Sequence, residues 1–373
     1  MMHLSYCTNV HPAEDLDGVI AQLDQFAGPA RSEAELDVVG VGLWLPAELA
    51  HELATNETSR DRLRAALERN GLEVRTLNAF PYAAFHAEVV KLDVYLPDWT
   101  DRRRLEYTID AARALAAFLP PRADGSISTL PLGWRTGWGP AEDEVATAAF
   151  VELVAALEQI RDTTGHTIRI GIEPEPGCIL DNVADIVEWL GARSDVIDPE
   201  FVGVCLDTCH LAVSFADPTE AVTAIESAGL KVVKIQASAA LEVLTPADPA
   251  SREAIAVFGE PRYVHQVRER HADGILRVDD LDEALATLPG NGPWRVHFHV
   301  PLHMVPDAPL GATTDVLRTA VDAVVATRPT HDVHLDVETY TWSVLPEPPA
   351  DLAAGIASEL AWAQRELMGA RIE

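Results

Sequence analysis

Basic residues and cysteines are scarce in this sequence. Only 28 lysines and arginines stand against 59 aspartates and glutamates, so the formal net charge is −31 at pH 7. A surface this acidic repels phosphate backbones and anionic membranes, and we therefore expect no nucleic-acid partner. The four cysteines include no CxxC pair. This argues against a zinc ribbon and predicts buried thiols in a reducing, cytoplasmic compartment.

Long apolar runs are also missing. No stretch reaches the ~18 uninterrupted apolar residues that a membrane helix needs. The start MMHLSYCTNVHP lacks the basic segment and apolar run of a signal peptide, so we expect no membrane insertion. The sequence has no GxGxxG after a strand, no Walker A lysine, no GxSxG and no HExxH. These absences argue against dinucleotide, nucleotide and serine-hydrolase sites.

Short β-branched runs alternate with longer helical patterns along all 373 residues. Such repeated βα units predict a parallel sheet, and barrels of this length fold as one domain. We therefore expect one (β/α)8 TIM-barrel domain over 1–373. Strands are predicted at 3–9, 37–45, 73–80, 126–132, 167–173, 202–207, 230–236, 294–300 and 332–338. Helices are predicted at 57–70, 101–118, 141–163, 181–193, 217–228, 279–288, 313–327 and 350–368.

These strands are one too many for an eight-stranded barrel. The segment 237–293 lies between two late strands, is long, and contains prolines and aspartates. Connections of this length are usually functional loops. We therefore expect an insertion or a lid at 237–293, and one predicted strand outside the barrel.

The alternation within the strands indicates where a site lies. In 167–173 three isoleucines point to one face, whereas Arg169, Gly171 and Glu173 point to the other. The same division recurs in 202–207, 294–300 and 332–338. A sheet buried on both faces would not carry so many charges on one of them, but a barrel with a reactive mouth would. Polar residues at the carboxyl ends of the strands should therefore converge on one site.

Three acids stand where these polar faces end. Glu173 lies in IEPEP, Asp207 in LDTCH and Glu338 in DVETYTW. A carboxylate in that position is suited to bind a metal ion or to move a proton, although Asp207 also fits the cap of a following helix. His210 follows Asp207 by three residues and is a candidate substrate contact.

Nitrogen and amide ligands come from two other runs. HFHVPLH carries His297 and His299 on one face of a predicted strand, and imidazole is a common ligand for borderline metals. Gln236 ends the strand 230–236 and could be a neutral oxygen ligand, as an alternative to His299. Other polar or aromatic residues that could line a pocket are Asn9, Trp44, Asn78, His265 and His297.

At these motifs the chain resembles the xylose-isomerase-like TIM barrels, which include sugar isomerases, ketose epimerases and endonuclease IV relatives. The resemblance implies that Glu173, Asp207, His299 and Glu338 hold one divalent ion, and that His210 contacts the substrate. Within that superfamily the chain looks like the EboE family of metabolite-traffic proteins. HLSYCTNVHP, YVHQV, HFHVPLH and VETYTWSVLP carry this likeness, which implies work on a metabolite precursor without naming a reaction.

The leading hypothesis is a metal-dependent isomerase or epimerase of a small polyhydroxy metabolite, with Glu173 and Glu338 as general base and acid. Mn²⁺ or Mg²⁺ suits the oxygen-rich ligand set, and the histidine keeps Zn²⁺ and Co²⁺ open. One alternative is a non-catalytic binder that keeps the barrel pocket. Another is a phosphodiesterase like endonuclease IV, which the charge of −31 argues against. A homo-oligomer is compatible with the sequence.

Overall fold

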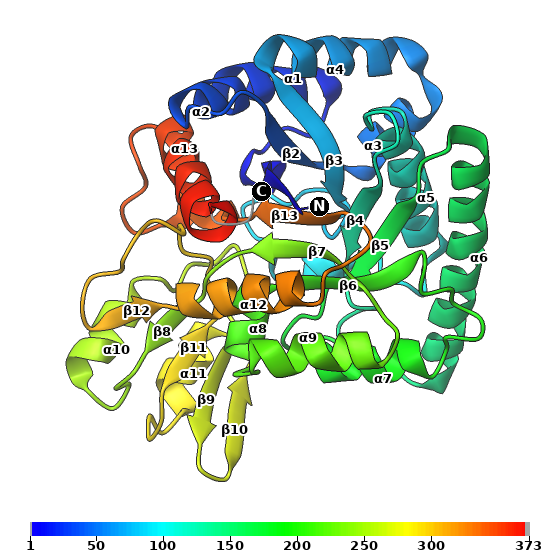
Figure 1. Ribbon diagram of the computed structural model, residues 1–373. Coiled ribbons are helices and arrows are strands. Elements are labelled where there is room, and N and C mark those ends of the chain that lie inside the picture. The colour runs from blue at the N-terminus through cyan, green and yellow to red at the C-terminus, as the bar shows by residue number, and fades with distance from the viewer. Residues whose placement is uncertain (1, 370–373) are drawn as a thin grey trace.

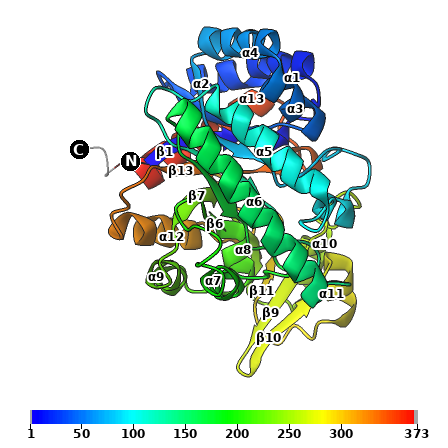
Figure 2. The ribbon, with the colours of Figure 1, turned by 90° about the vertical axis from the view of Figure 1, so that its right-hand side faces the viewer.

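A closed barrel of eight parallel strands forms the centre of the protein (Figures 1 and 2). The computed structural model describes residues 2–369. Around the barrel the strands follow the order β1, β2, β3, β4, β5, β6, β7, β13, and β13 closes onto β1. They are β1 (Met2–Cys7), β2 (Val39–Trp44), β3 (Leu72–Asn78), β4 (Gly125–Thr129), β5 (Ile168–Ile172), β6 (Val202–Asp207), β7 (Val232–Ala237) and β13 (Val333–Val337). The predicted (β/α)8 barrel is therefore confirmed.

Helices surround the barrel and cover the apolar face of its strands. They are α1 (Leu16–Gln22), α2 (Gly28–Glu33), α3 (Ala47–Thr55), α4 (Glu57–Asn70), α5 (Arg102–Ala116), α6 (Pro140–Thr164), α7 (Val183–Gly191), α8 (Thr208–Val213), α9 (Pro218–Ser227), α12 (Thr314–Ala326) and α13 (Leu352–Ala363). The long helices lie where the sequence predicts them. The short helices α1, α2, α3 and α8 were not predicted.

A second sheet lies beside the barrel (Figure 1, lower left; Figure 2, lower right). It is formed by the segment that lies between β7 and α12 in the sequence. Its strands are antiparallel and follow the order β10-β9-β11-β8-β12. They are β8 (Leu241–Val243), β9 (Val267–His271), β10 (Gly274–Val278), β11 (Trp294–Val296) and β12 (Leu310–Ala312), and they are accompanied by α10 (Pro249–Ala256) and α11 (Leu281–Thr287). The predicted insertion between late strands is thus present, and its sheet continues past residue 293.

The interpretation of 294–300 as a strand with a face inside the barrel is wrong. Only Trp294–Val296 is a strand, and it pairs with β8 and β9 in the second sheet. An antiparallel strand with one buried face alternates in the same way as a barrel strand. Alternation alone therefore could not assign this strand to the right sheet.

The polar face of the barrel strands encloses a buried ion pair. Lys234 on β7 places Nζ 2.9 Å from Oδ2 of Asp336 on β13, and both side chains are fully buried. Ser5 on β1 donates a hydrogen bond to Asp336 Oδ1 at 2.7 Å. Gly42 on β2 leaves the room for this carboxylate, because a Cβ there would lie 2.1 Å from Asp336 Oδ2. The ion pair lies beneath the site described below.

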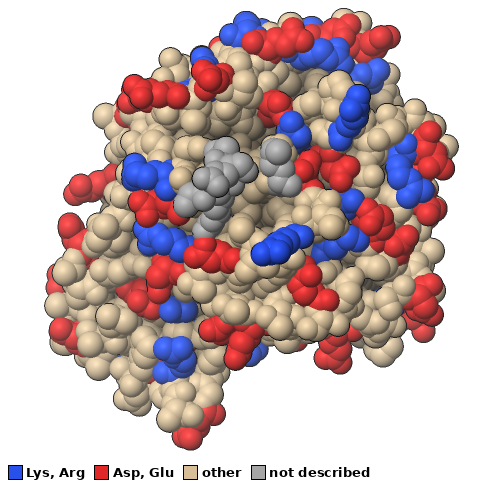
Figure 3. Space-filling model, viewed as in Figure 1, with Lys and Arg blue, Asp and Glu red and all other residues tan. Residues whose placement is uncertain are grey.

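Acidic side chains are spread over the outer surface and alternate with basic ones on the face shown in Figure 3. Many form exposed pairs, such as Arg102 with Glu152 and Arg69 with Asp24. Exposed pairs of this kind contribute little to stability. Among residues 2–369, every helix is too short or too polar to cross a bilayer.

Candidate metal centre

Three buried carboxylates meet at the carboxyl ends of the barrel strands. Glu173 follows β5, Asp207 ends β6 and Glu338 follows β13, and ligand oxygens of the three lie within 4.8 Å of one another. Burial, then repulsion from Glu338 and Asp207, raises the pKa of Glu173 well above its usual range. Burial, then repulsion from Asp207, does the same to the pKa of Glu338. A bound cation would relieve both effects, so the donor set fits a divalent ion.

Asp207 uses its two carboxylate oxygens differently. Oδ1 accepts hydrogen bonds from the backbone N–H of His210 and from the hydroxyl of Ser238, at 2.8 and 2.9 Å. Oδ1 therefore caps α8, and the capping and ligand hypotheses for this residue are compatible. Oδ2 is buried and has no hydrogen-bond partner among the described residues. That oxygen is free to bind an ion.

His299 offers a neutral nitrogen to the same space. Its Nδ1 donates to the carbonyl oxygen of Glu338 at 2.8 Å, so Nε2 carries the lone pair. Nε2 has no partner among residues 2–369 and lies 4.0 Å from Asp207 Oδ2. Burial lowers the pKa of His299 to about 4, which keeps the ring neutral near pH 7. A neutral imidazole is the form that binds metals.

Gln236 reaches the centre from the barrel itself. It pairs in register with Asp207 on β6 and with Asp336 on β13, and it shares a strand face with Lys234. Its amide oxygen and nitrogen are buried without a partner in the described part of the chain. Gln236 and His299 thus both remain candidate ligands. Gln236 lies near the end of the seventh barrel strand, and His299 lies on the segment after β11.

Two amides hold Glu338 in place. Asn9 and Asn78 each donate from Nδ2 to Glu338 Oε1, at 2.7 and 2.9 Å. Asn9 follows β1 and Asn78 ends β3, so the carboxylate is bound from two other strands. These bonds orient Glu338, and the one from Asn9 lowers its pKa, although less than burial raises it.

His210 and His297 face each other across the mouth. Each Nδ1 donates to an oxygen: His210 to the carbonyl of Pro174 at 2.8 Å, and His297 to Oε1 of Gln266 at 2.6 Å. Two neutral rings would therefore direct lone pairs at each other, yet their Nε2 atoms lie 3.1 Å apart. A cation bound between the two nitrogens would make this contact favourable.

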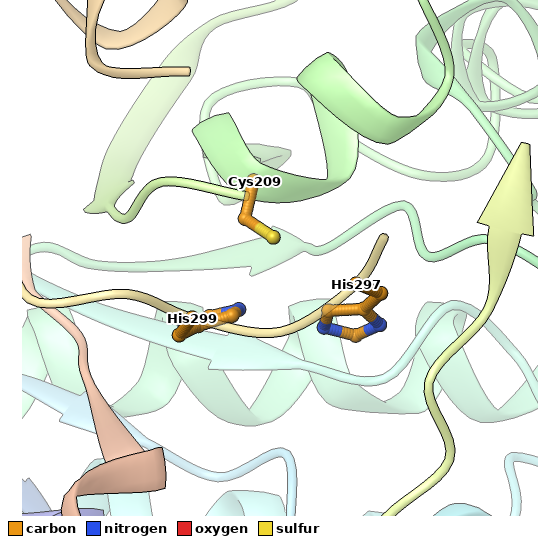
Figure 4. Close-up of side chains that lie close together, drawn as sticks. All are labelled: Cys209, His297 and His299. Carbon is orange, nitrogen blue, oxygen red and sulfur yellow. The ribbon is translucent and has the colours of Figure 1, made fainter. Parts of the chain in front are cut away.

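Cys209, in the first turn of α8, faces the rings of His297 and His299 (Figure 4). The three possible ligand atoms lie within 4.8 Å of one another. Burial raises the pKa of the Cys209 thiol well above its usual range, and a thiol must lose its proton to bind a metal. The carboxylates and His299 therefore form the better ligand set.

A pocket opens above the carboxylates, and the space in it amounts to about 510 Å³ when the part open to solvent is counted. Its lining holds most of the predicted site residues, joined by tyrosines and phenylalanines. The lining residues are Asn9, Asn78, Phe80, Pro81, Phe85, Lys91, Val94, Tyr95, Glu173, Glu175, His210, Tyr263, Val264, His297, His299, Glu338 and Tyr340.

Two predicted substrate contacts lie behind this lining. Trp44 is buried and donates from Nε1 to the carbonyl of Pro81 at 3.1 Å. His265 bonds the carbonyl of His297 through Nδ1 and Glu260 through Nε2, at 2.8 and 2.9 Å. Both side chains are committed to protein partners, so the structure makes them supports of the pocket wall. They were predicted as substrate contacts because strand alternation and motif position do not reveal which polar atoms already have hydrogen-bond partners within the protein.

Several pocket residues were not predicted as site residues. Glu175 accepts a hydrogen bond from the hydroxyl of Tyr95 at 2.6 Å, and Gln266 donates to Tyr95 at 3.1 Å. Glu175 lies in the IEPEP motif and Gln266 in YVHQV, so a signal existed for both. Tyr95 comes from the loop after β3, and no motif in the sequence marks it.

The fold and the strand-end acids together define a class: α/β barrel proteins whose polar site lies at the carboxyl mouth of the barrel. Residues 31–286 match the family model described as xylose isomerase-like TIM barrel. The chain belongs to this family.

Similar solved structures agree on the fold. An L-ribulose 3-epimerase is 11% identical with a TM-score of 0.54, and the alignment covers 100% of this chain and 96% of that one. A D-allulose 3-epimerase from Methylomonas sp. is 12% identical with a TM-score of 0.53 and 98% coverage of both chains. A xylose isomerase domain protein from Alicyclobacillus acidocaldarius is 14% identical with a TM-score of 0.50, covering 99% and 98%. No curated protein sequence matches the chain.

Proposed function

We propose that this protein is a divalent-metal-dependent isomerase or epimerase of a small polyhydroxy compound. The observation that carries the proposal is the group of three buried carboxylates within 4.8 Å of one another, beside the unpartnered Nε2 of His299. Three acids buried together repel one another strongly unless a cation joins them. Lys234 does not serve as that cation, because Asp336 already pairs with it.

The ion would be held by Glu173, Asp207, His299 and Glu338, with the amide oxygen of Gln236 as a further ligand. Mostly oxygen donors suit Mn²⁺ or Mg²⁺, and the single imidazole also suits Zn²⁺ or Co²⁺. When bound, such an ion polarises a carbonyl group and makes the neighbouring C–H bond more acidic.

The chain's own acids would move the proton. One of Glu173 and Glu338 takes the proton from the carbon beside the carbonyl, and the other returns a proton to the opposite face of that carbon. Return of the proton to the same carbon gives the epimer. Return to the former carbonyl carbon gives the isomer, provided that the α-hydroxyl proton also moves to the former carbonyl oxygen so that the C=O and O–H groups exchange places. Asn9 and Asn78 hold Oε1 of Glu338, which leaves Oε2 for the reaction. His210 would contact a substrate oxygen from the other side.

The likeness to the EboE family of metabolite-traffic proteins supports work on a metabolite precursor. Each motif that carries this likeness places a residue at the pocket: Asn9 from HLSYCTNVHP, Tyr263 from YVHQV, His299 from HFHVPLH and Glu338 from VETYTWSVLP. Motifs far apart in the chain thus contribute to one site. A small molecule is accordingly the proposed partner, in a cytoplasmic protein.

The test combines metal analysis with turnover. Purified protein dialysed against chelator should lose about one divalent ion per chain, and the Glu173→Ala/Asp207→Ala double variant should bind none. In the reloaded enzyme, Glu173→Gln or Glu338→Gln should lower turnover of sugars and precursor metabolites by roughly 10²–10⁴-fold. Glu144→Gln, which changes an exposed acid on α6, is the matched control. Tight metal binding by the double variant would refute the site.

The same measurements separate the alternatives. A non-catalytic binder would retain metal and ligand binding but show no turnover that Glu338→Gln could abolish. A phosphodiesterase like endonuclease IV would hold two or three ions per chain and cleave abasic DNA. An epimerase should hold one ion per chain and should exchange the substrate's α-hydrogen with solvent deuterium.

A further inference from the structure

The pocket above the carboxylates has two chemically different parts. Its floor is the acid and imidazole group described above. Its sides are formed by four rings, which we call the aromatic wall: Phe80, Phe85, Tyr263 and Tyr340. These rings come from three segments, namely the loop after β3, the insertion, and the turn after β13. Three distant segments therefore place aromatic side chains around one space.

Three rings of the aromatic wall, those of Phe85, Tyr263 and Tyr340, form a packed unit. The rings of Phe85 and Tyr340 lie 5.4 Å apart, those of Tyr263 and Tyr340 4.9 Å, and those of Phe85 and Tyr263 5.2 Å, measured between centroids. Tyr340 also lies 4.7 Å from the ring of His299. Contacts at these distances fix ring orientation. The wall is thus continuous with the candidate metal centre through Tyr340.

Three polar atoms at or near the wall are already used by the protein. The hydroxyl of Tyr263 donates to the carbonyl of Phe85 at 3.3 Å, and the hydroxyl of Tyr95 donates to Glu175 at 2.6 Å. The indole nitrogen of Trp44, behind the wall, donates to the carbonyl of Pro81. Apart from the hydroxyl of Tyr340, the four rings of the wall therefore present only ring faces and edges to a ligand.

The charges at the pocket argue against an anionic ligand. Lys91 is the one lysine or arginine among the described residues of the lining, and its Nζ lies 2.6 Å from Oδ2 of Asp280. Glu173, Glu175 and Glu338 face the same space. A phosphate or carboxylate on the substrate would meet three acids and one neutralised lysine.

We propose that the substrate is a neutral molecule in which a hydroxy-ketone head is joined to a flat apolar substituent. The head would lie on the carboxylate floor, and the substituent would lie against the aromatic wall. This inference rests on the proposed function, because it uses the same centre for the head. Hydroxyls of a free sugar that lay against these ring faces would have no partners there, whereas an aryl group loses no hydrogen bonds.

A matched series of probes tests the proposal on the Mn²⁺-loaded protein. The probes are erythrulose, its 4-O-benzyl ether and its 4-phosphate, with affinity measured by calorimetry. The benzyl ether should bind at least about tenfold more tightly than erythrulose, and the phosphate more weakly than erythrulose. Phe85→Ala and Phe80→Ala should each reduce the preference for the benzyl ether several-fold. Leu276→Ala, on exposed β10 outside the pocket, should leave it unchanged.

The possible results distinguish failure of this inference from failure of the proposed function. Equal affinity for erythrulose and its benzyl ether, in protein that holds the ion, would overturn the inference but not the metal centre. Tightest binding of the phosphate would show an anionic occupant and also overturn it. A benzyl preference that survives in both alanine variants, each with unchanged metal content, would exclude the aromatic wall as its source. Protein that binds no ion yet prefers the benzyl ether would refute the proposed function and leave the wall as the specificity element.

Discussion

Glu359 is a buried carboxyl group on α13 that ties two segments of the mouth together. Its Oε1 accepts hydrogen bonds from the backbone N–H of Leu302 at 2.9 Å and from the hydroxyl of Thr339 at 2.7 Å. Burial raises the pKa of Glu359 to about 7, above the 4.5 of an exposed glutamate. The folded state therefore binds this proton more tightly than the unfolded state. Its contribution to stability is complete below pH 4.5 and is lost as the pH rises through 7.

Glu359→Gln should remove this pH dependence, because the amide oxygen can accept the same two bonds without ionising. At pH 8 the variant should be more stable than the parent by up to about 3 kcal/mol, and at pH 5 the two should be nearly equal. Urea unfolding at both pH values measures the difference. Glu347→Gln, at an exposed position, is the control and should show no such change. A parent whose stability does not fall between pH 5 and pH 8 relative to the Gln variant would contradict the assignment.

Asp207 shows what the sequence could and could not reveal about a single residue. Its place at the end of a polar strand face predicts a ligand, and its place before a helix predicts a cap. The structure gives each role one oxygen, since Oδ1 caps α8 and Oδ2 has no partner among the described residues. Sequence could not divide the roles, because the division depends on where Ser238 places its hydroxyl.

At the scale of single elements, β2 carries glycine where the barrel interior is tightest. A Cβ at Gly42 would lie 2.1 Å from the Asp336 carboxylate, which pairs with Lys234 at 2.9 Å. Gly42→Ala must displace that carboxylate and weaken a buried ion pair. We expect a loss of roughly 3 kcal/mol in the free energy of unfolding. Gly191→Ala, where the new Cβ meets nothing within 4 Å, should be close to neutral in the same denaturation experiment. Equal losses of unfolding free energy in the two variants would show that a Cβ at position 42 can be accommodated without weakening the ion pair.

The segment after β11 is the element that sequence patterns assigned to the wrong sheet. It was predicted to face the barrel axis, and it instead runs over the mouth from the second sheet. His297 and His299 still reach the carboxylates, because the alternation that puts them on one face continues beyond Val296. The residues were therefore predicted for a partly wrong reason. The segment that follows the second sheet thus supplies an imidazole nitrogen 4.0 Å from Oδ2 of Asp207.

At the scale of the whole molecule, an excess of acid makes the fold sensitive to a bound cation. The net charge is −31, and three of the acids meet at one buried point. An ion that binds only the folded state at 100 times its Kd should stabilise it by about 2.7 kcal/mol. Thermal unfolding of chelator-treated protein should therefore shift upward when Mn²⁺ is added. In Asp207→Asn the shift should shrink to what Mn²⁺ produces by surface screening alone. An equal shift in parent and variant would place the stabilising ion elsewhere.

The sequence by itself determined the barrel and the acids at its mouth. Both follow from local rules: a strand alternates between two faces, and parallel strands end at one edge, so Glu173, Asp207 and Glu338 had to converge. Only the tertiary structure decided the sheet of Trp294–Val296, the neutral state of His299, the partners that withdraw Trp44 and His265 from the pocket, and the aromatic wall. These depend on contacts between residues far apart in the chain, and the alternation of one segment carries no information about which distant segment it meets.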